Sequence, residues 1–359
     1  MKEKLTHTSS AQITEQQDLL ADLITNLHYE QQPELEMKYG RAGKERCKKD
    51  CRYHLSYLAE AVRLQSPEIF TGYLQWAQVM LQSRNIPVED LAGNLKYLDI
   101  ACRQLLTRDN YEVVSSHIYN AIKSLKYNTT VTGSFLSNDN PLLLYAKQYL
   151  SLLLKAKRKE AQCLIEDLLK NGQLIPDIYE NIFAATQYEV GLLWQTNKIT
   201  VAHEHYCTAA TQLIMSTLYP LIFNAEKKKH KMLACTVSGG LHELGIRMIS
   251  DFFERDGWDT YYMGASMPDI NIISAIKEQH ADILAVSISM PFDISKLETL
   301  INKIRSDATL NNLKIIVGGH PFNQLPELWK RVGADGWAKS AREAVELANQ
   351  MMYNKKITV

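Results

Sequence analysis

Five short apolar runs alternate with helical segments over the last third of the chain, and this alternation constrains the fold more than any other feature. Apolar strands separated by helices favour a parallel sheet covered on both faces. We therefore predict a doubly wound, flavodoxin-like (Rossmann-type) parallel sheet of five strands, closed by a helix at 342–352. The expected strands are 232–237, 260–263, 283–287, 314–317 and 336–338.

The first two thirds of the chain show helical periodicity in place of this alternation. Apolar residues recur at helical spacing between 34 and 125, whereas residues 1–32 carry only a short helical patch at 19–27. Thr, Ser, Asn, Gly and Asp fill 128–141, as is typical of a linker. Four further helices joined by short turns predict an antiparallel bundle, with helices at 142–154, 158–170, 175–194 and 201–223.

These patterns predict an α plus α/β multidomain protein with three parts. The first is an all-α N-terminal sensory domain at 1–133. The second is a four-helix bundle cap at 137–225, and the third is the α/β domain at 230–359. Lys and Arg together number 40, as do Asp and Glu, so the basic imprint of a DNA-binding domain is absent.

Cysteine usage and hydropathy indicate the cellular setting. The six cysteines are scattered without a Cys-x-x-Cys pair, which favours a reducing, cytoplasmic environment. No apolar run reaches about 18 residues, so we expect no membrane role.

A glycine-bearing loop, Ser-Gly-Gly-Leu-His-Glu-Leu-Gly at 238–245, follows the first expected strand. It places His242 at the carboxyl edge of the sheet, where open α/β folds bind ligands. A neutral imidazole is a good ligand for cobalt, iron, zinc or copper, and no second ligand stands at metal-binding spacing. A single protein ligand suits a metal held in a macrocycle, such as haem or a corrinoid. The alternative is an ordinary loop histidine beside a flexible turn.

Small residues follow two other expected strands, and a polar hairpin lies in the bundle. Ser287 and Ser289 end the third strand, and the pair Gly318-Gly319 ends the fourth, where backbone can approach a flat group or a nucleotide tail. An ordinary turn explains the glycine pair equally well. In the bundle, the turn at 197–200 brings Trp194 near Glu204 and His205, although a core indole and a surface pair are the alternative.

Together these patterns resemble the adenosylcobalamin-binding light sensors of the CarH type, and also corrinoid-binding methyltransferase modules. The resemblance implies adenosylcobalamin bound base-off/His-on, with His242 as the lower axial ligand of cobalt. It implies a nucleotide tail beside Ser287, and Trp194 over the upper face. The implied cofactor-binding residues are Trp194, Glu204, His205, Gly240, Leu241, His242, Gly245, Ser287, Ser289, Gly318 and Gly319.

Two positions depart from the family pattern. Gly240 stands where a carboxylate usually precedes the ligand histidine, so another group or water must orient the imidazole of His242. Gln195 stands where a histidine often follows the cap tryptophan. In the light sensors that histidine takes the open upper position of cobalt after illumination, and His203 or His205 would have to replace it here.

The N-terminal stretch 46–58 resembles the helical region of photocobilins, which bind cobalamin and a bilin side by side. This resemblance implies biliverdin as a second cofactor. Suitable residues are Tyr53, His54 and Tyr57, with Trp76 as a further aromatic and Arg46 and Arg52 as cations. A plain helical core with a tolerated histidine is the alternative.

The predicted function is a non-enzymatic, cobalamin-dependent photoreceptor. Light would cleave the cobalt–carbon bond, change the assembly state of a homo-oligomer (a dimer or tetramer), and signal to a partner protein, without direct DNA binding. A corrinoid carrier subunit of a methyltransferase system is the first alternative. A helical scaffold that has lost cobalamin binding is the second, since Gly240 weakens the ligand motif.

Overall fold

The computed structural model describes residues 2–125, 133–223 and 226–353, with side chains described from residue 5 onward. The chain forms two compact units: residues 1–132 with the turn 195–198, and residues 133–194 with 199–359. Within the predicted linker at 128–141, residues 128–132 lie outside the described part of the chain. None of the described helices is both long and apolar enough to span a membrane.

The N-terminal unit is all helical, as predicted, but its first 32 residues differ from the prediction of a short helical patch. They form two helices, because one face of the first is buried through small polar residues that carry no hydropathy signal. Thr6 and Ser9 are buried there, and the Ser9 hydroxyl lies 3.0 Å from Asn110 Oδ1. The helices are α1 (Lys2–Glu15), α2 (Gln17–Gln31), α3 (Glu34–Arg63), α4 (Pro67–Gln82), α5 (Val88–Leu105) and α6 (Arg108–Ser124).

The second unit begins with the predicted four-helix bundle. Its third helix is continuous from 175 to 195 but contains one π-helical turn. Thr200 caps the fourth helix by accepting a hydrogen bond from the His203 backbone. The elements are α7 (Leu143–Leu154), α8 (Arg158–Lys170), α9 (Ile175–Ile178), η1 (Tyr179–Ala184), α10 (Ala185–Gln195), α11 (Val201–Thr217) and α12 (Tyr219–Ile222).

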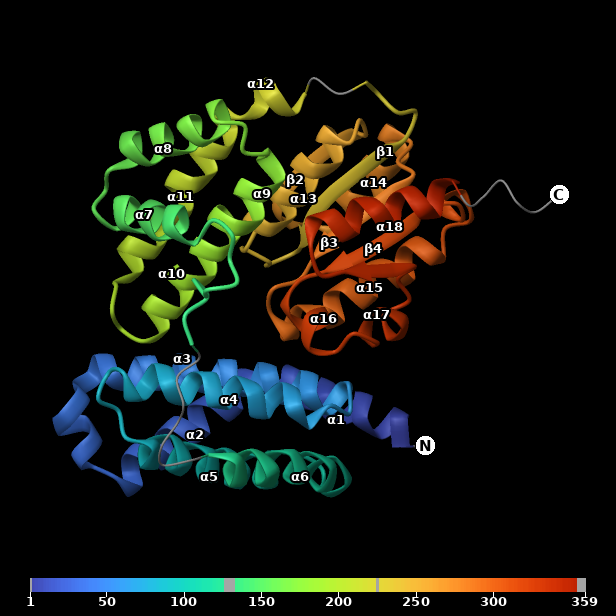
Figure 1. Ribbon diagram of the computed structural model, residues 1–359. Coiled ribbons are helices and arrows are strands. Elements are labelled where there is room, and N and C mark those ends of the chain that lie inside the picture. The colour runs from blue at the N-terminus through green and yellow to red at the C-terminus, as the bar shows by residue number, and fades with distance from the viewer. Residues whose placement is uncertain (1, 126–132, 224–225, 354–359) are drawn as a thin grey trace. The chain divides into compact units, whose positions relative to one another are not determined.

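The five-stranded parallel sheet has the order β2-β1-β3-β4-β5, which confirms the predicted flavodoxin-like topology. Helices cover both faces of the sheet (Figure 1). The strands are β1 (Lys231–Val237), β2 (Asp259–Met267), β3 (Ile283–Ser287), β4 (Lys314–Gly318) and β5 (Gly336–Ala338). The main helices are α13 (Leu244–Arg255), α14 (Asp269–Gln279), α15 (Ile294–Arg305) and α18 (Ala341–Tyr353), with shorter turns at η2 (Pro291–Asp293), η3 (Ala308–Leu310), α16 (His320–Gln324) and α17 (Leu328–Arg331).

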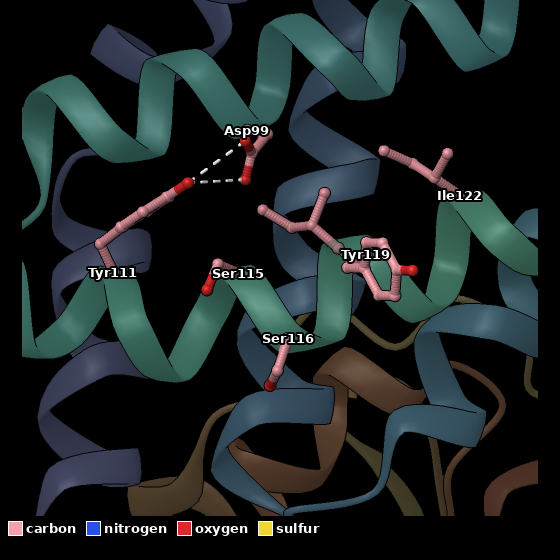
Figure 2. Close-up of a pocket in the computed structure, with 7 residues that line it drawn as sticks. Asp99, Tyr111, Ser115, Ser116, Tyr119 and Ile122 are labelled. Atoms are coloured by element: carbon pink, nitrogen blue, oxygen red, sulfur yellow. Dashed lines mark hydrogen bonds between the residues drawn. The ribbon is translucent and has the colours of Figure 1, made fainter.

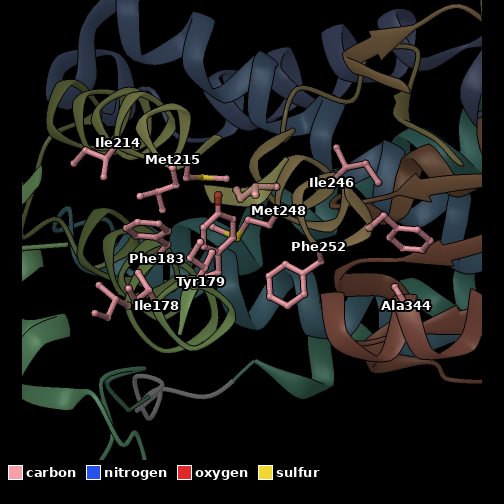
Figure 3. Close-up of a cluster of buried hydrophobic side chains, with 14 of the residues drawn as sticks. Ile178, Tyr179, Phe183, Ile214, Met215, Ile246, Met248, Phe252 and Ala344 are labelled. Carbon is pink, nitrogen blue, oxygen red and sulfur yellow. The ribbon is translucent and has the colours of Figure 1, made fainter. Parts of the chain in front are cut away.

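One apolar core joins the bundle to the α/β domain, as Figure 3 shows. Tyr179 of the π-helical turn packs its ring against Phe183, at 5.3 Å between centroids, and against Phe252 of α13, at 5.8 Å. Rings this close contribute beyond their buried area. The bundle is therefore seated on α13, the helix that follows the histidine loop.

Candidate functional site

The first half of the loop after β1, residues 238–240, is anchored by the sheet and by α15. Thr236, at the end of β1, donates its hydroxyl hydrogen to the Gly240 carbonyl at 2.6 Å and accepts one from the Ser266 backbone at 2.9 Å. Lys296 of α15 donates to the Ser238 carbonyl at 3.1 Å. Three elements of the α/β domain thus fix residues 238–240.

His242 follows this anchored segment and lies exposed at the carboxyl edge of the sheet. Among the described residues its ring makes no hydrogen bond, ion pair or ring contact. The neighbouring Leu241 is 75% exposed. A bare imidazole beside an exposed apolar side chain is available to an incoming ligand.

Position 240 leaves little room for a side chain. A Cβ atom added to Gly240 would lie 3.1 Å from Thr236 Oγ1 and 3.1 Å from the Val237 carbonyl oxygen. A side chain at 240 would therefore press against the Thr236 hydroxyl and the end of β1, which would have to shift slightly to admit it. Glu243, the nearest acid in sequence, is engaged with Gln212 and Tyr262 and is not available to orient the His242 ring.

The small residues after β3 and β4 lie at the same sheet edge, because β3 pairs in parallel with both β1 and β4. Ser287 is buried and pairs with Gly318 in the register, and Ser289 is half-buried just beyond the strand. Gly319 has φ +103°, and a Cβ there would lie 2.1 Å from the Ile288 carbonyl oxygen. Packing of the two strand ends therefore requires glycine at 319 with or without a ligand.

The cap residues lie at one end of the bundle. Trp194 is half-buried near the end of α10, and Glu204 and His205 lie in the first turns of α11. The structure brings Glu204 and His205 together, with 2.6 Å between Glu204 Oε2 and His205 Nδ1. His203 is used in the cap of α11, where its Nδ1 lies 2.8 Å from the Thr200 hydroxyl.

One face of α11 carries His205, Ala209, Gln212 and Ser216 at helical spacing. At one end of this face, Gln212 bonds Glu243, and Ser216 accepts from Arg247 at 2.6 Å. At the other end, His205 and Ala209 are exposed. This face of α11 thus contacts the α/β domain at residues 212–216 and is exposed to solvent toward residue 205.

A buried carboxylate ties the bundle to α13. Asp251 accepts a hydrogen bond from the Tyr179 hydroxyl at 2.8 Å, and both residues are buried. Burial raises the pKa of Asp251 to about 6, against the opposing effects of the Tyr179 hydrogen bond and Arg247. The sequence patterns did not predict this contact, or those of Glu243 with Gln212 and Tyr262. A polar residue gives no sign in the sequence of the distant residue that it will contact.

This carboxylate makes the stability of the bundle–α13 contact depend on pH. Its native pKa lies above its ordinary value of 3.8, so between those pH values the native state holds a proton that the unfolded state has lost. Unfolding free energy should therefore fall as pH rises from about 4 to 6, by up to about 3 kcal/mol. Asp251→Asn keeps the Tyr179 bond and should remove this part of the slope. Urea unfolding of both proteins across this range measures it; parallel slopes would contradict the assignment.

The predicted bilin residues lie on α3, except Trp76, which lies on α4. His54 is buried, its Nδ1 lies 2.9 Å from the Tyr73 hydroxyl, and burial lowers its pKa to about 4. Tyr57 stacks on Tyr73 with 3.8 Å between ring centroids, while Tyr53 is 42% exposed. Arg52 is held by Asp18 at 2.7 Å. The structure thus brings Tyr57 and His54 together through Tyr73, a residue that the sequence patterns did not single out.

Two cavities of the described chain lie away from the predicted sites. One, of about 430 Å³, lies along α5 and α6, where the Tyr111 hydroxyl donates to Asp99 at 3.2 Å (Figure 2). The other, of about 340 Å³, lies between β2 and α14 and includes Tyr262. None of the predicted cofactor residues lines either cavity. Among the residues that the structure describes, no cluster of three or more His, Cys, Asp or Glu side chains could hold a metal ion.

Comparison with known proteins agrees with the geometry of the second unit. Residues 230–346 match the B12 binding domain family, and residues 145–219 match a second family described in the same words. The dimethylamine corrinoid protein 1 of Methanosarcina acetivorans is 28% identical over 185 residues, covering 50% of this chain and 85% of the relative. A corrinoid protein of Desulfitobacterium hafniense is 27% identical over 168 residues, covering 45% and 76%.

A solved structure, the monomethylamine corrinoid protein of Methanosarcina barkeri, superposes with a TM-score of 0.53 at 18% identity. It covers 59% of this chain and 100% of that one, and this likeness shows the fold alone. The matches as a whole support a cobalamin-binding module formed by the bundle and the α/β domain. The cobalamin part of the sequence prediction is confirmed, whereas light sensing, the adenosyl form and biliverdin stay predictions.

Proposed function

We propose that this protein is a corrinoid carrier that serves a methyltransferase partner, with His242 as the lower axial ligand of cobalt. The observation that carries the proposal is the bare imidazole of His242 at the sheet edge, next to Glu243, which accepts a hydrogen bond from Gln212 of α11. The likeness to corrinoid proteins of methylamine metabolism supports a carrier over the light sensor that the sequence resemblance favoured.

The residues at this edge fit a corrinoid. His242 offers one nitrogen ligand that has no competing partner among the described residues, and Gly239 and Gly240 add no side chains just before it. Ser287 would hydrogen-bond the nucleotide tail, and α11 would exclude water from above the ring. Bound cobalamin would supply a cobalt centre that takes up and gives away a methyl group. The chain itself would contribute no catalytic residue and would depend on its partner for methyl transfer.

Methyl uptake tests this function directly. Protein loaded with cobalamin and reduced to cob(I)alamin would be mixed with a purified methylamine:corrinoid methyltransferase and mono-, di- or trimethylamine. We expect the bound cofactor to be methylated by one of these donors, and only when the enzyme is present. The absorption spectrum of the cofactor measures this methylation. Lack of methylation with all three donors would contradict the methylamine carrier.

A cobalamin photoreceptor is the second candidate, and the Glu204–His205 pair at the exposed end of the cap favours it. These side chains would hold an adenosyl group that light removes, which would unseat the bundle and change a homo-oligomer. The aromatic face of α3, with Tyr57 stacked on Tyr73, would take biliverdin. Protein loaded with adenosylcobalamin should then change size on illumination, and a bilin absorption band should appear when biliverdin is supplied. A size that is the same in dark and light would exclude this function.

A further inference from the structure

The carboxylate of Glu243 joins three elements that are far apart in sequence. Glu243 immediately follows His242 and precedes the first residue of α13. Its Oε1 accepts a hydrogen bond from Gln212 Nε2 of α11 at 3.0 Å, and its Oε2 accepts one from the Tyr262 hydroxyl of β2 at 3.1 Å. The last residue of the histidine loop is therefore bonded to the bundle and to the edge strand at once.

The surroundings of this carboxylate favour a fixed position. Gly264 has φ +76°, and a Cβ there would lie 3.1 Å from Glu243 Oε2, so glycine lets β2 approach the carboxylate closely. Burial, and then the charge of Glu243, raise the pKa of Tyr262, which keeps its hydroxyl protonated as a donor. The carboxylate is thus held by one donor from α11 and one from β2.

The two halves of the loop depend on different anchors. Residues 238–240 are held by Thr236 and Lys296, which both belong to the α/β domain. Residue 243 is held in part by Gln212, which moves with the bundle. Leu241 and His242 lie between the two anchors and have no anchor of their own among the described residues.

We infer that Glu243 is a positioning residue that couples the contact between the bundle and the α/β domain to the orientation of the His242 imidazole. This inference rests on the proposed function of His242 as the cobalt ligand. When α11 is seated, Gln212 holds Glu243 and limits the movement of His242. When a partner lifts α11 from the sheet edge, that bond is lost and the second half of the loop loosens. By linkage, cobalt ligation by His242 would in turn favour the seated bundle.

Gln212→Ala tests the coupling, with Ser216→Ala as the matched control. Ser216 lies one turn further on the same face of α11 and bonds Arg247, so its loss weakens the contact between α11 and the α/β domain without touching Glu243. In the cofactor-free protein we expect faster amide hydrogen exchange at 241–244 in Gln212→Ala, with 238–240 unchanged and Ser216→Ala like the wild type. Equal exchange at 241–244 in all three proteins would overturn the inference.

The cobalamin-loaded proteins give a second readout. Acid releases a ligating imidazole by protonating it, so weaker ligation moves the pH midpoint of release upward. Loss of a group that orients a metal ligand typically costs about 10–100-fold in metal affinity, so we expect a rise of about one pH unit in Gln212→Ala. Glu243→Gln keeps one acceptor oxygen and the shape of the side chain. It should therefore shift the midpoint less than Glu243→Ala.

The two readouts separate the inference from the function on which it rests. If wild-type protein shows imidazole ligation, and Gln212→Ala and Ser216→Ala share its midpoint, Glu243 has no positioning role. If wild-type protein shows no imidazole ligation, the proposed function fails, while the exchange at 241–244 still decides whether Glu243 couples loop and bundle.

Discussion

His242→Ala is expected to abolish imidazole ligation of cobalt and to lower the affinity for cobalamin by about 100-fold or more. Loss of a group that only orients a metal ligand costs about 10–100-fold, and this change removes the ligand itself. The neighbouring Glu243 does not offer a substitute, because it accepts hydrogen bonds from Gln212 and Tyr262. Equilibrium dialysis with cobalamin measures the affinity, and the absorption spectrum reports the ligation.

His7→Ala is the control for this variant, since His7 is an exposed histidine of the N-terminal unit. It should bind cobalamin as the wild type does. An affinity and spectrum of His242→Ala equal to those of the wild type would show that the corrinoid, if bound, is held through other groups. Absence of cobalamin binding in both proteins would favour the second alternative from the sequence, a helical scaffold that has lost cobalamin binding.

Gly319→Ala is expected to destabilise the α/β domain by about 3 kcal/mol or more, even without a cofactor. The added Cβ would lie 2.1 Å from the Ile288 carbonyl oxygen, and the backbone at φ +103° is strained for any residue with a Cβ. Overpacking and left-handed strain each cost about 1–3 kcal/mol, and both act at this position. Urea unfolding of the cofactor-free protein measures the loss.

Gly172→Ala separates the two costs. Gly172 has φ +86° but no atom within 4 Å of an added Cβ, so the variant carries the strain without the clash. It should lose about 1–2 kcal/mol. Equal losses at 172 and 319 would mean that the ends of β3 and β4 move apart easily, and the close packing at the sheet edge would then not be a fixed feature.

The sheet could be predicted because each strand is a short apolar run between helical segments. Residues 232–237 and 283–287 are almost wholly buried in the structure, and their neighbours along the chain are helices. Parallel strands separated by helices leave few topologies, so the order followed from general rules. The position of His242 at the carboxyl edge followed from the same reasoning.

The contacts that hold the site could not be predicted, because they join polar residues that are distant in sequence. Gln212 lies 31 residues before Glu243, and Tyr179 lies 72 residues before Asp251. Gln212, Tyr179 and Asp251 are ordinary polar residues on helices and Glu243 ends a loop, so only the packed structure reveals their partners. The helix α1 was missed for a related reason, since Thr6 and Ser9 are buried without being apolar.

The departure at Gly240 shows how a motif can change for a local reason. Sequence comparison marks the missing carboxylate as a defect in the ligand loop. In the structure, the Thr236 hydroxyl lies 3.1 Å from where a Cβ at 240 would stand, and it donates a hydrogen bond to the Gly240 carbonyl at 2.6 Å. Residues 238–240 are therefore well anchored, although the His242 ring has no acceptor of its own among the described residues.

Identifying the nitrogen atom that binds cobalt tests the proposed role of His242 most directly. Protein grown with histidine labelled with the heavy nitrogen isotope would be loaded with unlabelled cobalamin, reduced to the paramagnetic cob(II)alamin state, and measured by electron paramagnetic resonance. Ligation by the His242 imidazole predicts that each cobalt line splits into a doublet from heavy nitrogen, and that this splitting is lost in His242→Ala. A triplet from the ordinary nitrogen of the cofactor's own base, in labelled wild-type protein, would contradict it.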